Sequence, residues 1–222
     1  MSLPKLVIAN KRYSSWSLRP WLIATHFGIA FEEIPIDLSA PDFKAEILKV
    51  SPSGRVPCLI DGEAKVWETL AILEYWAESR PDLPIWPRGR LARAHARAIA
   101  NEMHAGFMAL RSACPMNLRR SFPWRDWGGA AAARDVARIE ELIAEARDRF
   151  GGSGPFLYGD VSAADAMYAP VAVRLDGYGW PVAPATRAWI DALFALPAFR
   201  AWKAGAYAET AIVADDEIDF AD

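Results

Sequence analysis

A proline-rich segment, RPDLPIWPRG at residues 80–89, divides the chain into two parts of different character. Its three prolines cannot continue a helix, because proline lacks a backbone N–H and its ring clashes with the preceding turn. Strand and helix patterns alternate before this segment, whereas strand patterns nearly vanish after it. We therefore expect an α/β domain at residues 1–80, a linker at 81–90 and an all-α domain at 91–222.

The first part has the order βαβ followed by ββα. Helices are expected at residues 17–27, 41–48 and 68–79. Short apolar runs predict the strands, of which the last two flank a hairpin turn at Asp61-Gly62; they are 5–10, 31–37, 56–62 and 65–67. A parallel pair joined to an antiparallel hairpin gives one mixed sheet with helices on its faces.

The second part shows apolar residues at helical spacing. One helix is predicted from residue 91 up to Pro115, and an acidic tail at 214–222 is predicted to fray. The other expected helices are 130–150, whose apolar face is Val136, Ile139, Ile143 and Ala146, then 162–175, 186–196 and 198–207. The predicted fold class is thus α/β followed by all-α.

Composition limits the partners. The net charge of −3 disfavours nucleic acid, because phosphate binding needs a concentrated basic surface. Arg88, Arg90, Arg93 and Arg97 form a local basic run that we interpret as a solvated helix face. With 53% hydrophobic and 24% charged residues, the chain is typical of a globular protein.

The two cysteines, Cys58 and Cys114, form no CxxC motif, which favours a reducing compartment over a disulfide framework. We see no signal peptide and no apolar run long enough to span a bilayer. These features predict a soluble cytoplasmic protein with no membrane partner. No metal site is expected, because the histidines at 26, 95 and 104 share no ligand spacing with the cysteines.

The segment SSWSLRPW, residues 14–21, places three serines where a strand gives way to a helix. Pro20 fits best in a first helical turn, so Ser17 is the expected N-cap. Ser14 and Ser15 then precede the helix at the carboxyl end of the first strand, where ligands bind in open α/β sheets. A nucleophilic serine would need a base, and His26 is about two turns away. The alternatives are hydrogen bonding to an anion such as a thiolate, or capping alone.

Two further segments carry polar groups beside expected turns. In SPSGRVPCLIDG (51–62), Pro57 indicates either a cis turn that presents the backbone of Val56, or an ordinary start of a strand. In WETLAILEYW (67–76), Glu68 and Thr69 stand at a helix start. They are caps, or they form with the free N–H groups a site for a carboxylate.

Taken in order, these segments resemble the glutathione S-transferase family over nearly the whole chain. SSWSLRPWLIA is similar to the serine-type opening of the zeta class, and GDVSAADAMYAPV resembles the family's capping box, with Ser162 as cap and Asp165 reaching back. The resemblance implies a thioredoxin-like domain followed by a helical domain, glutathione as co-substrate, a homodimer and a role in detoxification. Trp16 stands where the zeta opening has cysteine, which weakens the case for zeta-type isomerisation.

The resemblance also implies a role for each matching residue. Ser14 aligns with the thiol-activating serine and Ser15 is the second choice. The expected glutathione-binding residues are Val56 and the cis Pro57 for the cysteinyl part, Glu68 and Thr69 for the γ-glutamyl end, and, less firmly, Arg55.

The second substrate, a small apolar electrophile, is expected between the two domains. Its candidate contacts are Trp16, Met103, His104, Phe107, Met108 and Arg111, although a Met and Phe stripe is also typical of a core. The predicted function is transfer of glutathione to this electrophile. Two alternatives stay open, namely glutathione-dependent isomerisation or peroxide reduction, and a non-catalytic module of the same fold that binds partners.

Overall fold

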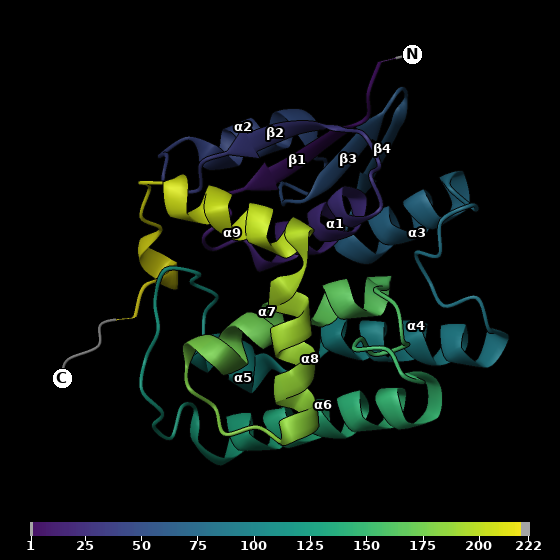
Figure 1. Cartoon of the computed structure of the whole chain (residues 1–222). Helices are drawn as coiled ribbons and strands as arrows, with labels where there is room; N and C mark the ends of the chain where they lie inside the picture. The colour runs from purple at the N-terminus through teal and green to yellow at the C-terminus, as the bar shows by residue number, and fades with distance from the viewer. Residues whose placement is uncertain (1, 219–222) are drawn as a thin grey trace.

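The computed structural model describes residues 2–218. Its first part builds one four-stranded sheet in the order β2-β1-β3-β4 (Figure 1). Strand β1 runs parallel to β2 and antiparallel to β3, and β3 and β4 form a hairpin. The strands are β1 (Lys5–Ala9), β2 (Glu32–Ile36), β3 (Cys58–Asp61) and β4 (Ala64–Trp67). The predicted mixed sheet is confirmed.

Three helices cover this sheet. Helices α1 (Ser15–His26) and α3 (Thr69–Ser79) lie on the side that faces the helical part of the chain, and α2 (Phe43–Val50) lies on the other side (Figure 1). Residues 6–9 of β1 are buried because helices cover both faces of the sheet. The carboxyl end of β1 therefore delivers the serine segment directly to the boundary with the helical part.

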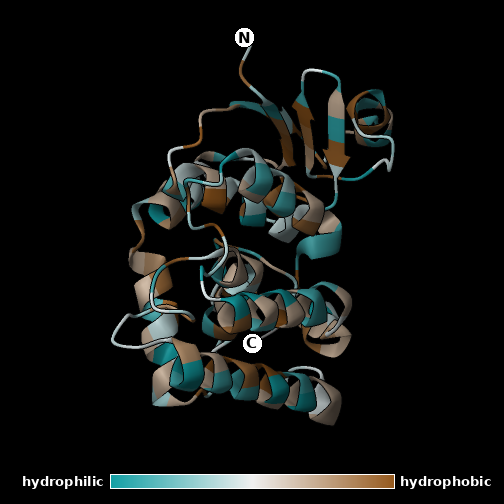
Figure 2. Ribbon diagram, turned by 90° about the vertical axis from the view of Figure 1, so that its right-hand side faces the viewer, coloured by the Kyte–Doolittle hydropathy of each residue, from teal (hydrophilic) through white to brown (hydrophobic). Residues whose placement is uncertain are grey.

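The helical part is organised around α7 (Ala163–Gly177), which packs against α1, α4 and α8. Nearly all of its residues are buried, because a helix surrounded by other helices has no solvent face. By contrast, the lowest helix in Figure 2, α6, mixes hydrophilic and hydrophobic residues along its length, and its predicted apolar face is buried. The remaining helices are α4 (Arg90–Ala105), α5 (Met108–Ala113), α6 (Gly129–Phe150), α8 (Pro184–Ala195), α9 (Pro197–Ala208) and the short 3₁₀ helix η1 (Ala214–Asp216).

The helix predicted to run up to Pro115 is interrupted at Gly106 and Phe107, so this prediction was wrong. Phe107 has a left-handed backbone with φ 58°, a conformation in which side chains larger than glycine are uncommon. A Cβ at Gly106 would lie 2.7 Å from the carbonyl oxygen of Glu102, so a larger residue does not fit there. The interruption lets α5 leave the direction of α4, which changes the residues that face the functional site.

The acidic tail does not fray where it is described. Glu217 accepts hydrogen bonds from the Arg12 guanidinium, the Tyr13 hydroxyl at 2.5 Å and the Asn117 amide at 3.1 Å. The fraying prediction is therefore wrong for residues 214–218, and residues 219–222 lie outside the described part. These contacts hold the tail against the segment that joins β1 to α1.

One continuous cluster of buried apolar side chains runs from Leu6 in β1 to Ala206 in α9. It passes through both parts of the chain, so the division at residues 81–90 stays a prediction. The predicted capping box is confirmed, with Ser162 and Asp165 bonded reciprocally at the start of α7. None of the helices between residues 2 and 218 combines the length and the apolar character needed to cross a bilayer.

Candidate active site

The start of α1 is held by two of the three serines. Ser14 is the N-cap: its Oγ accepts a hydrogen bond from Ser17 N at 3.4 Å and donates one to Ser17 Oγ at 2.7 Å. Ser17 lies inside the helix and is fully buried, and its Oγ also accepts from Ala9 N at 3.1 Å. The expectation that Ser17 caps the helix was wrong; it ties the helix to the end of β1.

Ser15 is the first residue of α1, and among residues 2–218 its hydroxyl has no hydrogen-bond partner. Its carbonyl oxygen accepts from Arg19 Nη1 at 3.0 Å. The first turn of α1 contains no acidic residue. The positive end of the helix dipole is therefore not balanced locally by a side-chain anion.

The loop before β3 offers unpaired backbone groups to the same region. The bond between Val56 and Pro57 is cis, as predicted. Within the described chain, neither the N–H nor the C=O of Val56 has a protein partner, and Val56 is half-buried. Such a residue can pair with an extended peptide in the manner of an added β-strand.

The start of α3 presents an acid and a hydroxyl. Glu68 precedes the helix with a left-handed backbone, φ 74°, and its Oε2 lies 3.0 Å from Nε2 of His104 on α4. The hydroxyl of the buried Thr69 donates to the carbonyl oxygen of Trp16 at 3.0 Å. Because this bond uses the hydroxyl proton of Thr69, the Thr69 oxygen can only accept a hydrogen bond from a ligand. The Glu68 side chain contacts the helical part.

These elements line two adjoining cavities. One of about 470 Å³, the arginine cavity, is lined by Ser14, Ser15, Arg174 and Asp216 among others. The other, of about 230 Å³, the α3 cavity, is lined by Pro57, Glu68, Thr69 and His104 among others. The residues that line both cavities are Trp16, Arg55, Val56 and Arg111. A ligand of peptide length can therefore lie in the α3 cavity and reach the serines in the arginine cavity.

The indole of Trp16, which lines both cavities, is held by several neighbouring side chains. The guanidinium carbons of Arg19 and Arg111 lie 4.1 and 5.0 Å from the centre of its ring. The ring of His104 meets it edge-on, with the ring centres 5.2 Å apart. Two cations and an imidazole thus fix the indole in place, in addition to the bond to its carbonyl oxygen.

Three arginines line the arginine cavity, namely Arg55, Arg111 and Arg174, and none of them forms a salt bridge within residues 2–218. Arg19 and Arg174 are buried and donate to carbonyl oxygens, including Met167 O and Cys114 O. Burial and the neighbouring charge of Arg111 lower the pKa of Arg174 to about 10. Burial lowers the pKa of Arg111 as well. Asp216, whose pKa burial raises, is the carboxylate that lines this cavity. Positive charge therefore exceeds negative charge around the cavity.

The structure brings together most of the predicted site residues. Two predicted electrophile contacts are exceptions: Met103 and Phe107 are buried in the core and line neither cavity. Met103 belongs to the buried apolar face of α4, and the interruption at Gly106 and Phe107 places Phe107 in the core before α5 begins. The candidate Met108 lines the arginine cavity, whereas sequence reasoning missed Ser112, Arg174 and Asp216, which line it as well. A lone arginine within the apolar run of α7 was the signal for Arg174.

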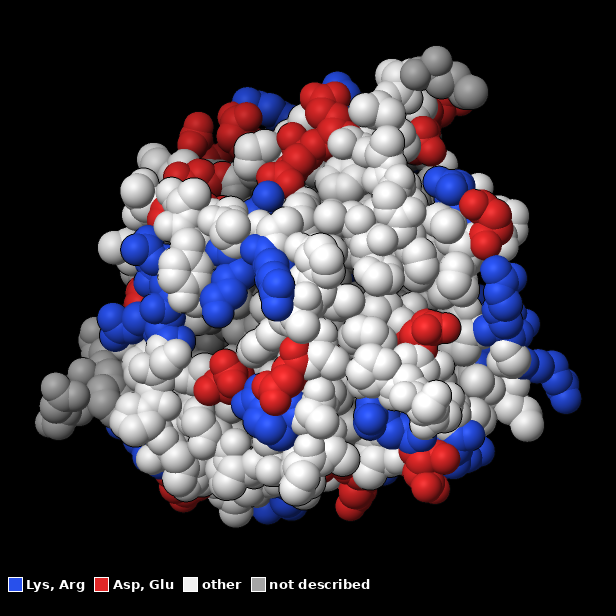
Figure 3. Space-filling view, in the orientation of Figure 1, with Lys and Arg blue, Asp and Glu red and all other residues white. Residues whose placement is uncertain are grey.

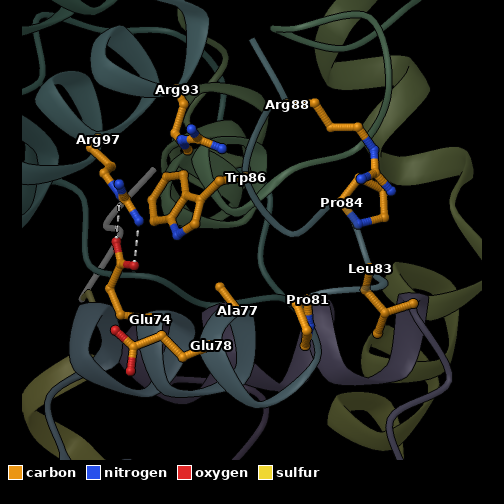
Figure 4. Close-up of a pocket in the computed structure, with 10 residues that line it drawn as sticks. All are labelled: Glu74, Ala77, Glu78, Pro81, Leu83, Pro84, Trp86, Arg88, Arg93 and Arg97. Carbon is orange, nitrogen blue, oxygen red and sulfur yellow. Dashed lines mark hydrogen bonds and ion pairs between the residues drawn. The ribbon is translucent and has the colours of Figure 1, made fainter. Parts of the chain in front are cut away.

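Arg88, Arg90 and Arg97 of the basic run are exposed, as the solvated-face interpretation predicts, but part of the run also borders a cavity. Arg88, Arg93 and Arg97 surround a separate cavity of about 340 Å³ between α3 and α4, beside the indole of Trp86 (Figure 4). Arg97 forms two hydrogen bonds to Glu74, at 2.8 and 2.7 Å. The molecular face in Figure 3 also mixes acidic and basic side chains, with acidic ones along its upper edge and a basic group at its left. In the described part of the chain, no three His, Cys, Asp or Glu side chains are grouped to hold a metal ion.

Comparison with known proteins agrees with this arrangement. The family models for the N-terminal and C-terminal domains of glutathione S-transferases match residues 13–79 and 129–202. A probable maleylacetoacetate isomerase of Caenorhabditis elegans is 29% identical over 186 residues, which cover 83% of this chain and 85% of that protein. A zeta-class glutathione S-transferase of Euphorbia esula is 30% identical over 177 residues, covering 75% and 74%. The crystal structure of a glutathione transferase homolog from Burkholderia, with bound glutathione, has a TM-score of 0.73 at 22% identity and covers 93% of this chain and 99% of its own. This chain belongs to the glutathione S-transferase family.

Proposed function

We propose that this protein binds glutathione, lowers the pKa of its thiol and directs the thiolate onto a small electrophile. The observation that carries the proposal is the start of α1. There a serine N-cap, a free hydroxyl and a first turn without acids line the same cavity as the unpaired backbone of Val56. A helix start of this kind is suited to an anion.

Glutathione has the length and the charges to fill both cavities. Its γ-glutamyl ammonium would bind Glu68 and the lone pairs of Thr69, and its γ-glutamyl carboxylate the free N–H groups at the start of α3. The cysteinyl backbone would pair with Val56, with Arg55 close by in both cavities. The sulfur would then lie in the arginine cavity beside Ser14 and Ser15.

Ser14 would stabilise the thiolate by turning its hydroxyl. In the free protein this hydroxyl donates to Ser17 Oγ, a neutral acceptor. A thiolate is a charged acceptor and forms a stronger hydrogen bond, so the proton would swing to the sulfur. Together with the helix dipole, this bond would lower the thiol pKa from about 8.5 by one to two units, worth about 1.4–2.7 kcal/mol. A large share of the bound glutathione would then be thiolate, and therefore reactive, at neutral pH.

The reaction that follows is attack of the thiolate on an electrophilic carbon. In substitution, the new carbon–sulfur bond forms as the leaving group departs with its electron pair. The protein holds the two reactants together and excludes water. The homodimer, the cytoplasmic location and the role in detoxification belong to this proposal as well.

The test is ultraviolet titration of the bound thiol in the unmodified protein and in Ser14→Ala. We expect Ser14→Ala to raise the thiol pKa by about one to two units and to leave the affinity for glutathione within a few-fold. Ser15→Ala is the matched control and should leave the pKa unchanged. A rise in Ser15→Ala alone would move the role to the neighbouring serine. Failure of the unmodified protein to bind glutathione would overturn the proposal.

A second candidate function is glutathione-dependent isomerisation of an acidic compound. The excess of arginines around the arginine cavity favours it, because guanidinium groups bind carboxylates. The name of the nematode relative, maleylacetoacetate isomerase, likewise denotes an acid as substrate. Isomerisation returns the thiolate after each turnover, whereas conjugation consumes it. Measurement of free thiol during turnover of neutral and acidic electrophiles therefore separates the two functions, and a panel without turnover would favour the non-catalytic binding module.

A further inference from the structure

His104 and Glu68 meet across the α3 cavity. His104 lies near the end of α4 in the helical part, and Glu68 precedes α3 in the sheet part, with 3.0 Å between Nε2 and Oε2. Both side chains are partly exposed, 34% for His104 and 46% for Glu68. An exposed pair of this kind adds little to folding stability. Its position at the mouth of a binding cavity therefore matters more than its strength.

His104 is the one group between residues 2 and 218 that holds the Glu68 carboxylate. The left-handed backbone of Glu68 fixes where its side chain begins. Beyond that point, the hydrogen bond to His104 is the carboxylate's only polar contact with the described chain. Without this bond the side chain would sample several rotamers, and each ligand would have to select one of them.

The imidazole is itself held from the other side. Its ring meets the Trp16 indole edge-on, and the carbonyl oxygen of Trp16 accepts from Thr69, the residue that follows Glu68. The contacts thus form a closed circuit that runs from Glu68 to His104, then to Trp16 and through Thr69 back to Glu68. A carboxylate in such a circuit is preorganised, which reduces the entropy lost when a ligand binds.

We propose that His104 is a positioning residue for the amine end of glutathione. Its Nε2 occupies one oxygen of Glu68, Oε2, and leaves Oε1 for the γ-glutamyl ammonium. This inference rests on the proposed function, and it moves His104 from the predicted electrophile site to the glutathione site. Arg55 and Arg111 line the same cavity but are cations, so they cannot take the place of Glu68 in binding an ammonium group.

Two substitutions separate the hydrogen bond from the ring contact. His104→Phe keeps an aromatic ring against Trp16 and removes the donor, whereas His104→Gln keeps an amide donor and removes the ring. We expect His104→Phe to raise the Kd and the KM for glutathione about 3- to 10-fold, since a hydrogen bond to a charged group of this exposure is modest. His104→Gln should stay within about 2-fold, and neither should change kcat or the KM for the electrophile.

The same measurement in a Glu68→Ala background tests the route of the effect. If His104 acts through Glu68, His104→Phe should add no further loss there. An equal loss in both backgrounds would overturn the proposal, as would a change in kcat or in the electrophile KM. Normal glutathione binding in His104→Phe would overturn the role of His104 alone. Absence of binding by the unmodified protein would overturn the proposed function with it. Thermal unfolding of each variant checks that it is folded.

Discussion

Helices α1 and α7 both begin with a serine cap, yet their starts differ in charge. At α7 the residue three positions after the cap is Asp165, which is buried and accepts from Leu157 N, Ser162 N, Ser162 Oγ and Trp189 Nε1 at 2.9–3.0 Å. At α1 the equivalent position is Ser17, and the first turn has no acid. The α7 terminus thus contains its own anion, whereas the α1 terminus does not.

The difference indicates how one local motif serves two purposes. A helix start whose dipole is balanced by an internal carboxylate has little affinity for another anion, so α7 uses its cap for folding. The α1 start keeps its positive end free at a cavity lined by arginines. The residue three places after the cap, more than the serine itself, distinguishes the structural start from the candidate catalytic one.

Removal of the α7 anion should have the largest effect on stability. Asp165→Ala leaves four donors without their acceptor in a buried place, and we expect a loss of about 3–5 kcal/mol in the free energy of unfolding. Urea unfolding measures it. The folded fraction should still bind glutathione with normal affinity. A loss below about 1 kcal/mol would mean that the two helix starts do not differ as described.

Introduction of an anion in the first turn of α1 should make this helix start resemble that of α7, whose dipole is balanced by a carboxylate. Ser15→Asp places a carboxylate in the first turn, which should stabilise the helix by about 0.3–1 kcal/mol. The same charge should raise the pKa of the bound thiol by about one to three units through like-charge repulsion. Ser15→Asn is the neutral control of the same shape. Ultraviolet titration checks the pKa, and equal values in the two variants would contradict the electrostatic account.

Reduction of the positive charge beside α1 should weaken the binding of an acidic electrophile, and it tests whether the arginines add to the anion preference of this helix start. Arg111→Gln is suited to this, because Arg111 is only half-buried and the one hydrogen bond of its guanidinium in the described structure is to Gly106 O at 3.2 Å. We expect the KM of an acidic electrophile to rise about tenfold, equivalent to about 1.4 kcal/mol, because one guanidinium partner is lost. The KM of a neutral electrophile should change little. Equal changes for both would assign Arg111 a packing role.

Deletion of each cap should have the smallest effect. Ser162→Ala should cost about 1–2 kcal/mol of stability, whereas Ser14→Ala should cost about 0.5 kcal/mol, since its cap bond is long at 3.4 Å. The effects on the thiol pKa should be in the opposite order, because Ser14→Ala should raise this pKa and Ser162→Ala should leave it unchanged. Denaturant unfolding and thiol titration on the same pair of variants measure both quantities. A larger stability loss in Ser14→Ala would reverse the comparison.

Local patterns in the sequence were enough for the features that local contacts determine. The Ser162 and Asp165 box and the cis Pro57 before β3 were expected from segments that resemble the family's, and both depend on residues close together in the sequence. The cap of α1 was assigned to the wrong serine, because the burial of Ser17 depends on a contact with β1 that spacing does not reveal. The contact between Glu68 and His104 joins residues 36 positions apart, so it required the fold.

The candidate contacts for the electrophile show the same limit. Trp16 and Arg111 line the arginine cavity, whereas Met103 and Phe107, proposed on the assumption of one continuous helix, are buried in the core. A single residue with a left-handed backbone changed which face of that segment meets the cavity. Periodicity predicts that a helix has an apolar face, and it does not predict which neighbour covers that face.

Arg19 lies in α1, and its Nε donates to Met167 O of α7 at 2.9 Å, deep inside the apolar cluster common to both parts of the chain. A fragment that ended at residue 80 would lack the helical part that covers α1. The apolar side chains around Arg19 would then be exposed to water. The two parts should therefore melt in a single calorimetric peak, and neither should be soluble when expressed alone. In a chimera that combines this sheet part with the helical part of a relative, the residues that face α1 would have to be kept from this chain.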